Sequence, residues 1–391
     1  MALRFLTAGE SHGPSLTAIL DGFPAGLELN IEQINADLAR RQQGFGAGPR
    51  MKLERDQVKV LSGVMEGRTI GSPLALSIAN LNHARWQGKA VEAFTTPRPG
   101  HVDLAAAIKY GFNDLRPGLE RASARETAAR VAVGAICKQL LKKFGIVVGG
   151  YVSSIGKIAA DLSQIDLANR SRLAEQNDVR CPDPHSAEQM QAAIQAAIEA
   201  RDTLGGILEV YALGVPAGLG SHTQWDQRLE ARLGAAILSI QAIKGVEFGE
   251  AFANTRLPGT QVHDPIHLDG ERLTRSTNRA GGIEGGITNG MPIFIRAAMK
   301  PIATTLTPQQ TVNLATGQEV PTTYERSDFC PVPRAVPILE AMLAFILCDA
   351  LIEKIGGDSL DEMEPRFEAL RQARLPDLPM DADDHIFWPD E

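Results

Sequence analysis

The chain has 391 residues, 44% of them hydrophobic, and a formal net charge of −8 at pH 7. This length allows a large buried core in one big domain or two, while the acidic balance argues against general affinity for nucleic acid, so basic clusters are better interpreted as local pockets. The four cysteines lie far apart and lack metal-ligand spacing, which indicates reduced thiols in a cytoplasmic protein. We also expect no secretory segment and no membrane-spanning run.

Strand-like segments alternate with long helical ones, and no clean linker separates them. The helix that follows Arg116 and Pro117 is expected to end near Phe144, because Lys142 and Gly145 are typical of a helix C-terminus. In chain order we predict helices over 116–144, 185–201, 229–244 and 337–355, and strands over 146–153, 206–215 and 246–252.

The run from Glu120 to Val133 places arginines in a segment made largely of alanine, serine and threonine. In a helix, Arg121 and Arg125 lie one turn apart on one face, whereas Arg130 lies on the opposite face and can pair with Glu126. Because a guanidinium stays charged and binds phosphate or carboxylate in a bidentate way, the first face is a candidate anion clamp. A solvated face held by helical ion pairs is the alternative for this pattern alone.

Two short loops supply histidines that could act as acids or bases near neutral pH. Residues 9–14, GESHGP, place Ser11 and His12 directly after an apolar start. Residues 96–103, TPRPGHVD, set His101 in a proline-stiffened loop. For either loop taken alone, a structural turn with a satisfied histidine is the simpler interpretation.

Basic and glycine-rich segments complete the pattern. Residues 39–56 surround a short glycine-rich stretch with arginines and a lysine, which suggests a lid over an anion. Residues 277–293 are also rich in glycine, which lets backbone amides approach a ligand closely. A glycine cluster alone is weak evidence for phosphate binding, and the dinucleotide-binding fingerprint is not present in convincing form. The segments 299–305, MKPIATT, and 324–342, YERSDFCPVPRAVPILEAM, follow.

Together and in this order, these segments resemble the chorismate synthase family from about Leu3 to about Gly357. The resemblance implies an α+β fold, a single large domain with long helices sandwiched between antiparallel β-sheets, and an acidic, peripheral extension over residues 358–391. It implies a lyase of the shikimate pathway of aromatic amino acid biosynthesis, which converts 5-enolpyruvylshikimate 3-phosphate to chorismate and phosphate by 1,4-elimination. It also implies reduced FMN as the cofactor, NADPH as a candidate reductant, and a homotetramer.

The resemblance assigns roles to residues at matching motif positions. His12 is expected to protonate the flavin or hold its charge, His101 to assist the departing phosphate, and Asp328 to help take the ring proton through flavin N5. The residues implied in flavin binding are Arg121, Ala122, Ser123, Gln241, Ala242, Gly285, Lys300, Pro301, Ile302, Ala303, Thr304 and Arg326. The residues implied in substrate binding are Ser11, Arg41, Ala47, Arg50 and Arg125, with Arg98 as a further candidate cation.

Ala47 departs from the family pattern, because the resembling loop usually reads Gly-Arg-Gly. Because this guanidinium is missing, the alternative function is a non-catalytic or impaired oligomer that binds flavin or phosphate. A serine hydrolase using Ser11 and His12 is disfavoured, because no G-x-S-x-G elbow accompanies them. The spacing of His263 and His267 resembles a metal pair, but no cysteine or carboxylate companions stand at zinc spacing, so we expect no metal held by protein ligands.

Overall fold

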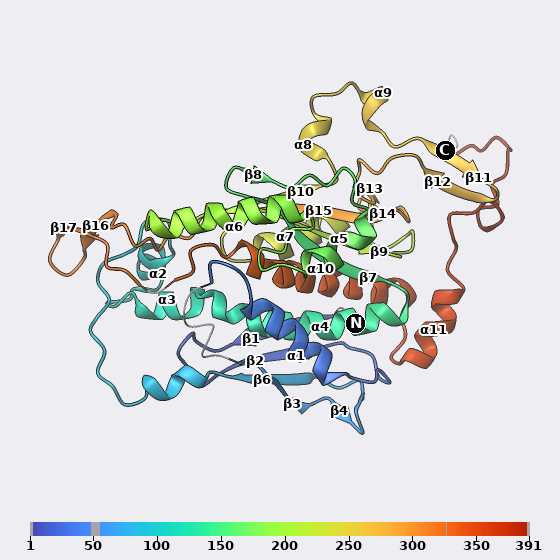
Figure 1. Cartoon of the computed structure of the whole chain (residues 1–391). Coiled ribbons are helices and arrows are strands. Elements are labelled where there is room, and N and C mark those ends of the chain that lie inside the picture. The colour runs from blue at the N-terminus through green and yellow to red at the C-terminus, as the bar shows by residue number, and fades with distance from the viewer. Residues whose placement is uncertain (1–2, 48–54, 326, 389–391) are drawn as a thin grey trace.

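Two antiparallel β-sheets enclose the central helices of the computed structural model (Figure 1), which describes residues 3–47, 55–325 and 327–388. One sheet has the strand order β1–β2–β6–β3 and the other β10–β15–β9–β7–β8. The strands of the first sheet are β1 (Arg4–Ala8), β2 (Ser15–Asp21), β6 (Leu74–Ala79) and β3 (Val58–Ser62). Those of the second are β10 (Ile243–Phe248), β15 (Ile293–Met299), β9 (Gly206–Leu213), β7 (Val147–Ile155) and β8 (Ile158–Ala159). The predicted α+β sandwich is confirmed.

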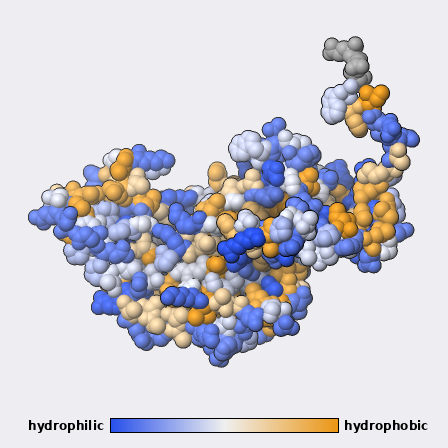
Figure 2. All heavy atoms as spheres, turned by 90° about the horizontal axis from the view of Figure 1, so that it is seen from above, coloured by the Kyte–Doolittle hydropathy of each residue, from blue (hydrophilic) through white to orange (hydrophobic). Residues whose placement is uncertain are grey.

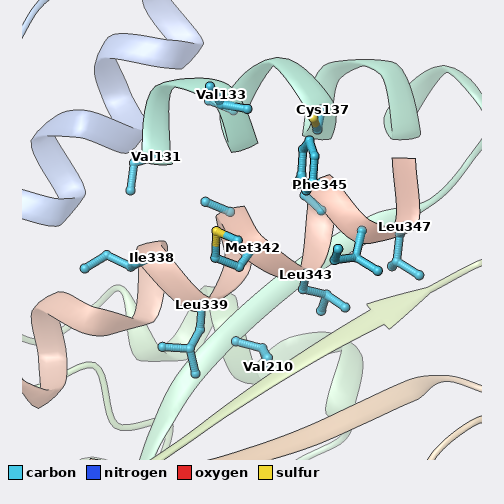
Figure 3. Close-up of a cluster of buried hydrophobic side chains, with 14 of the residues drawn as sticks. Val131, Val133, Cys137, Val210, Ile338, Leu339, Met342, Leu343, Phe345 and Leu347 are labelled. Atoms are coloured by element: carbon cyan, nitrogen blue, oxygen red, sulfur yellow. The ribbon is translucent and has the colours of Figure 1, made fainter. Parts of the chain in front are cut away.

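Two long helices, α4 (Thr127–Lys143) and α10 (Val332–Ile355), form the middle layer. Figure 3 shows side chains of both helices gathered in one apolar cluster with Val210 of β9. The helices approach closely at Gly134, where an added Cβ would lie 2.3 Å from the Cα of Ala341. By length and composition α10 could span a membrane, but 94% of its apolar window is buried inside the protein, so it serves as the core helix.

Shorter elements surround this core. Within the described residues, the other helices are α1 (Ile31–Gln42), η2 (Leu81–Arg85), α2 (Asp103–Tyr110), α3 (Arg116–Ala122), η3 (Ala124–Glu126), α5 (Leu167–Ala174), α6 (Pro184–Glu199), α7 (Leu229–Leu238), α8 (Ala251–Asn254), α9 (Gly259–Val262), α11 (Leu360–Glu368) and η4 (Leu375–Asp377). The small hairpins pair β4 (Val64–Met65) with β5 (Arg68–Thr69), β11 (Ile266–Asp269) with β12 (Arg272–Arg275), β13 (Ile283–Glu284) with β14 (Ile287–Thr288), and β16 (Gln310–Asn313) with β17 (Gln318–Pro321).

The predicted helix over 116–144 is wrong in one respect, because it is interrupted at Ser123. Ser123 has extended backbone angles (φ −61°, ψ 138°), and its hydroxyl accepts a hydrogen bond from the backbone N–H of Arg125. Serine commonly caps a helix in this way. Arg121 and Arg125 therefore lie in different elements, α3 and η3, and do not form the continuous helical face that their spacing predicted. The predicted pair of Arg130 and Glu126 is present, with 3.0 Å between the charged atoms.

Two other predicted helices have different ends. The helix predicted over 229–244 ends at Leu238. It could not continue to 244, because Ala242 takes a left-handed conformation (φ 67°) that a right-handed helix does not accommodate. The helix predicted from 337 begins at Val332 and runs through Pro337. Proline has no N–H to donate to the carbonyl four residues earlier. That carbonyl, of Pro333, instead accepts a 2.7 Å hydrogen bond from Arg180.

The predicted acidic extension, residues 358–391, begins in contact with the body of the protein. The backbone N–H of Ala25 donates to the carbonyl of Asp358, and Leu360 and Met363 of α11 are buried. Further along, Phe387 and Trp388 are exposed. Figure 2 shows this last part extending away from the rest of the molecule. The domain boundary itself stays a prediction.

Candidate active site

The loop between β1 and β2 holds His12 against α3. Glu120 of α3 binds His12 twice, since its Oε1 lies 2.6 Å from Nδ1 and its Oε2 accepts a 2.8 Å hydrogen bond from the backbone N–H. Burial would raise the pKa of Glu120, but the hydrogen bonds from His12 hold it below its usual range. The imidazole also packs on Trp86, with 4.3 Å between ring centroids. An ionised carboxylate and an aromatic ring thus fix the orientation of His12.

Ser11 is buried beside His12 and ties the same loop to the break between α3 and η3. Its backbone N–H donates to the carbonyl of Glu120 at 3.1 Å, and its hydroxyl lies 3.1 Å from that of Ser123. Asn80 donates its side-chain amide to the carbonyls of Glu10 and Gly13. Backbone and side-chain hydrogen bonds therefore hold this loop against α3 and Ser123.

The second histidine, His101, lies in the loop before α2. Its Nδ1 is 2.5 Å from Oδ1 of Asp103 and 2.9 Å from Nη2 of Arg98, while Arg98 Nη1 donates to the Thr304 hydroxyl at 3.3 Å. Burial would raise the pKa of Asp103, but hydrogen bonds from His101 and Arg98 hold it well below its usual range. A cavity of about 360 Å³ adjoins this loop and is lined in part by Arg98 and His101.

A buried carboxylate joins two of the predicted substrate-binding arginines. Asp56 accepts from Arg41 at 2.8 Å and from Arg125 at 2.6 and 2.7 Å, and all three side chains are almost fully buried. Burial would raise the pKa of Asp56, but the two guanidinium groups keep it below its usual range. Burial, reinforced by Arg334 and Arg125 and opposed by Asp56, lowers the pKa of Arg41 to about 10. Arg41 therefore remains charged at neutral pH.

Asp328 and the loop that contains Ala47 lie next to this arginine cluster. Arg334, at the start of α10, donates to the carbonyl of Arg41 at 3.1 Å and forms an ion pair with Asp328. The carbonyl of Gly46 accepts from the backbone N–H of Phe329, the residue after Asp328. The contact with Phe329 places Ala47, one residue after Gly46, near the candidate base. Arg41 and Arg125 thus bind Asp56, while Arg334 binds Asp328.

The residues predicted to bind flavin come from several elements. Arg121 donates to the backbone carbonyls of Thr7 and Gly9, at the end of β1 and just beyond it. Gln241 donates to Glu126 at 3.4 Å, and its Oε1 is buried without a hydrogen-bond partner within the described residues. The backbone N–H of Lys300 donates to the carbonyl of Ala242 at 3.0 Å.

The Lys300 side chain links the residues predicted to bind flavin to the loop that contains His101. Its ammonium donates to the carbonyl of Gly100 at 2.6 Å, and Thr304 contacts Arg98 as described above. Gly285 is exposed in the turn between β13 and β14, and no described hydrogen bond joins it to the other predicted residues. Arg50 and Arg326 lie outside the described residues.

Comparison with known proteins decides which family this arrangement belongs to. The chorismate synthase family model matches residues 3–352. The chain belongs to the chorismate synthase family. A chorismate synthase of Geobacter sulfurreducens is 51% identical over 383 residues, covering 94% of this chain and 98% of the relative. One of Syntrophotalea carbinolica is 52% identical over 376 residues, covering 94% and 97%. A crystal structure of chorismate synthase superposes with a TM-score of 0.77 at 45% identity, covering 94% of this chain and 97% of the other.

Family membership identifies a carbon–oxygen lyase of aromatic biosynthesis, as the resemblance implied. Chorismate synthases depend on flavin, so a flavin site is expected in this fold. The alternative of a non-catalytic oligomer finds no support in these similarities. Within the described residues, no group of three or more His, Cys, Asp or Glu side chains is arranged to hold a metal ion.

Sequence reasoning missed the carboxylates of the site. Asp56, Asp103 and Glu120 each stand inside a segment that the motifs singled out, yet none received a role. Each carboxylate is paired with a residue that was predicted, namely Arg41, His101 or His12. A buried charged or titratable group requires a partner of opposite charge, and this rule points to Asp103, which stands two residues from His101. The same rule does not select Glu120, which lies 108 residues from His12, before the fold is known.

Proposed function

We propose that this chain converts 5-enolpyruvylshikimate 3-phosphate to chorismate and phosphate by 1,4-elimination, with reduced FMN as its cofactor. The observation that carries this proposal is the cluster of Arg41, Arg125 and Arg334, which pairs with Asp328 and is joined through Asn80 to the loop of the carboxylate-bound His12. Anion-binding groups and candidate proton carriers lie side by side there, which an elimination of phosphate requires.

The arginine cluster is suited to an anionic substrate. Within the described residues, the guanidinium groups of Arg41 and Arg125 pair with Asp56, and that of Arg334 pairs with Asp328. Arg41 Nε is buried without a hydrogen-bond partner within the part of the chain that the structure describes. In such a poorly solvated place, an anion gains more from each charged donor than it would in water. Phosphate and carboxylate groups of the substrate would bind there.

The predicted flavin-binding residues fit a flavin. Gln241 Oε1 is a buried acceptor without a partner among the described residues, and the polar N–H of a flavin ring would satisfy it. The left-handed backbone of Ala242 turns the chain beside it, and Arg121 and Lys300 offer cations for an anionic cofactor. Bound reduced FMN would supply electron density transiently while phosphate leaves.

The chain's own residues then carry the protons. His101 would donate a proton from its imidazole to the departing phosphate oxygen, and Asp328 would accept the ring proton on its carboxylate. His12, oriented by Glu120, would hold a proton beside the cofactor. We extend the proposal to a homotetramer in the cytoplasm, with NADPH as the candidate reductant.

Anaerobic incubation with the substrate tests this function. Chorismate and phosphate should form with photoreduced FMN, whereas oxidised FMN should support no turnover. The chain should also bind reduced FMN more tightly than oxidised FMN when substrate is present. Flavin binding without product formation would contradict the proposal in favour of a non-catalytic flavin-binding protein.

A further inference from the structure

Asp103 is the most completely buried charged side chain beside either histidine, with no exposed surface. Asp103 is the first residue of α2, and it binds Arg98 and His101 in the loop before that helix. Its Oδ2 accepts from Arg98 Nε at 2.8 Å and from the Arg98 backbone N–H at 3.1 Å. Its Oδ1 accepts from Arg98 Nη2 at 2.9 Å and lies 2.5 Å from His101 Nδ1.

These distances determine which ring nitrogen of His101 carries a proton. A guanidinium group can only donate hydrogen bonds, and an ionised carboxylate can only accept them. At 2.5 Å, Nδ1 and Oδ1 would repel each other unless a proton lay between them, so Nδ1 must be protonated. Arg98 Nη2 lies 2.9 Å from Nδ1 and 3.3 Å from Nε2. Since Nδ1 carries its own proton, only Nε2 has a lone pair that can accept from this guanidinium.

The remaining nitrogen, Nε2, is consequently the atom that can gain or lose a proton. Asp103 already neutralises Arg98, so a second proton on His101 gives the group of three side chains one net positive charge. A leaving phosphate would stabilise that charge. As the carbon–oxygen bond breaks, the bonding electrons pass to the phosphate oxygen, and this oxygen accepts the proton from Nε2. His101 would be left neutral, with its proton on Nδ1.

We propose that Asp103 is a positioning residue for the reaction, which fixes His101 as the Nδ1-protonated form and so directs Nε2 to the departing phosphate. This inference rests on the proposed function. Asp103 touches neither substrate nor reacting atoms in this scheme, and acts through His101. It also binds the backbone of Arg98, so a purely structural role is the competing explanation.

A double-mutant comparison separates the two roles. Asp103→Asn should lower kcat by about tenfold to a hundredfold with a smaller change in KM, the scale known for loss of the hydrogen-bond partner that orients a metal-ligating histidine. In a His101→Ala background the same change should have little further effect, because the group that Asp103 orients is already gone. Equal losses in both backgrounds would overturn the proposal and support a structural role.

Asp114→Asn is the matched control. Asp114 likewise accepts backbone hydrogen bonds, from Arg116 at 2.8 Å and Phe94 at 3.3 Å, but it has no described histidine partner. This variant should retain the parent kcat. If Asp114→Asn lowers kcat as much as Asp103→Asn does, loop stability accounts for the effect and the proposal fails.

Nitrogen-15 NMR of the imidazoles tests the proposal in the unmodified protein, whose fold no substitution has altered. His101, assigned by comparison with His101→Ala, should show a protonated Nδ1 at neutral pH. A neutral His101 protonated on Nε2 would overturn the assignment. Failure of the proposed function is distinguishable, because it would appear as absent turnover in the unmodified chain, whatever the state of His101.

Discussion

At the scale of single residues, each candidate histidine depends on a carboxylate. The sequence motifs singled out His12 and His101 because each stands in a short loop with turn-forming neighbours. The partner of His12 could not be predicted in this way, because Glu120 lies 108 residues further along the chain. Asp103, only two residues from His101, was within reach of sequence reasoning. Local motifs therefore identified the reactive groups, whereas the distant charge partner needed the fold.

Removing either imidazole should slow turnover without unfolding the protein. We expect His12→Ala and His101→Ala each to lower kcat by about tenfold to a thousandfold, the scale for losing a positioned proton donor. Asp328→Asn should do the same by removing a base. Steady-state kinetics with reduced FMN, alongside circular dichroism, measures both effects. His185→Ala, on the exposed surface of α6, is the control, and equal rates for all these variants would remove the assigned roles.

Restoring an arginine at position 47 should strengthen substrate binding. Ala47 lies in the loop whose Gly46 carbonyl accepts a hydrogen bond from Phe329, the residue after Asp328. A guanidinium at position 47 would therefore be placed to reach a substrate anion. A charge-assisted hydrogen bond contributes about 1.5 to 3 kcal/mol, or roughly ten- to a hundredfold in affinity. Ala47→Arg should lower KM or raise kcat/KM, with little change in thermal stability.

Gln43→Arg is the control for Ala47→Arg. It adds the same charge on the exposed end of α1, and it should leave the kinetics unchanged. If the two variants behave alike, the loop does not contact the substrate in the way proposed.

At the scale of elements, the sequence predicted helices better than their ends. The ion pair of Arg130 and Glu126 follows from helical spacing within one turn, and it is present. The break at Ser123 was missed because alanine-rich flanks favour an unbroken helix, whereas a serine cap and the loop around His12 favour the break. Because of this break, Arg121 donates to the carbonyl of Thr7 whereas Arg125 binds Asp56.

The close contact between α4 and α10 should make Gly134 intolerant of a side chain. Gly134→Ala improves helix propensity by up to about 1 kcal/mol. The new methyl would meet the backbone of Ala341 at 2.3 Å, and overpacking of this kind costs about 1 to 3 kcal/mol, so we expect net destabilisation. Urea unfolding measures the change.

Gly234→Ala in α7 is the matched control, because its nearest neighbouring atom would lie 4.0 Å from the added methyl. That variant should be neutral or slightly more stable. Stabilisation by Gly134→Ala would show that the two helices do not pack this closely.

At the scale of the whole molecule, ion pairs join helices that are distant in sequence. Glu340 of α10 is buried and binds Arg40 of α1 at 2.8 and 2.9 Å and Lys138 of α4 at 2.6 Å. Arg40 and Arg41, adjacent in α1, thus serve different purposes, since Arg41 belongs to the candidate site. Burial would raise the pKa of Glu340, but Arg40 and Lys138 lower it from 4.5 to about 2.

This pKa shift predicts how stability depends on pH. A carboxyl with a depressed pKa contributes stability above its unfolded value of 4.5, and the contribution is lost as the pH falls towards 2. Glu340→Gln should lower the free energy of unfolding by about 3 to 5 kcal/mol at pH 7, the usual cost of breaking a buried pair. The difference from the parent should shrink as the pH falls below 4.5.

Glu353→Gln provides the comparison, because Glu353 is on the same helix and its ion pair with Arg232 is exposed. Loss of this ion pair should lower the free energy of unfolding by less than about 1 kcal/mol. A Glu340→Gln effect that stayed constant from pH 7 to pH 3 in urea unfolding would exclude the buried ion pairs as its cause.

The central claim is that this chain eliminates phosphate without net oxidation. The most direct test follows phosphate release and flavin absorbance together, in an anaerobic sample with substrate in large excess over reduced FMN. We predict that many phosphates, and an equal amount of chorismate, form for each flavin, and that the flavin is still reduced at the end. One phosphate for each flavin oxidised, or no phosphate at all, would contradict it.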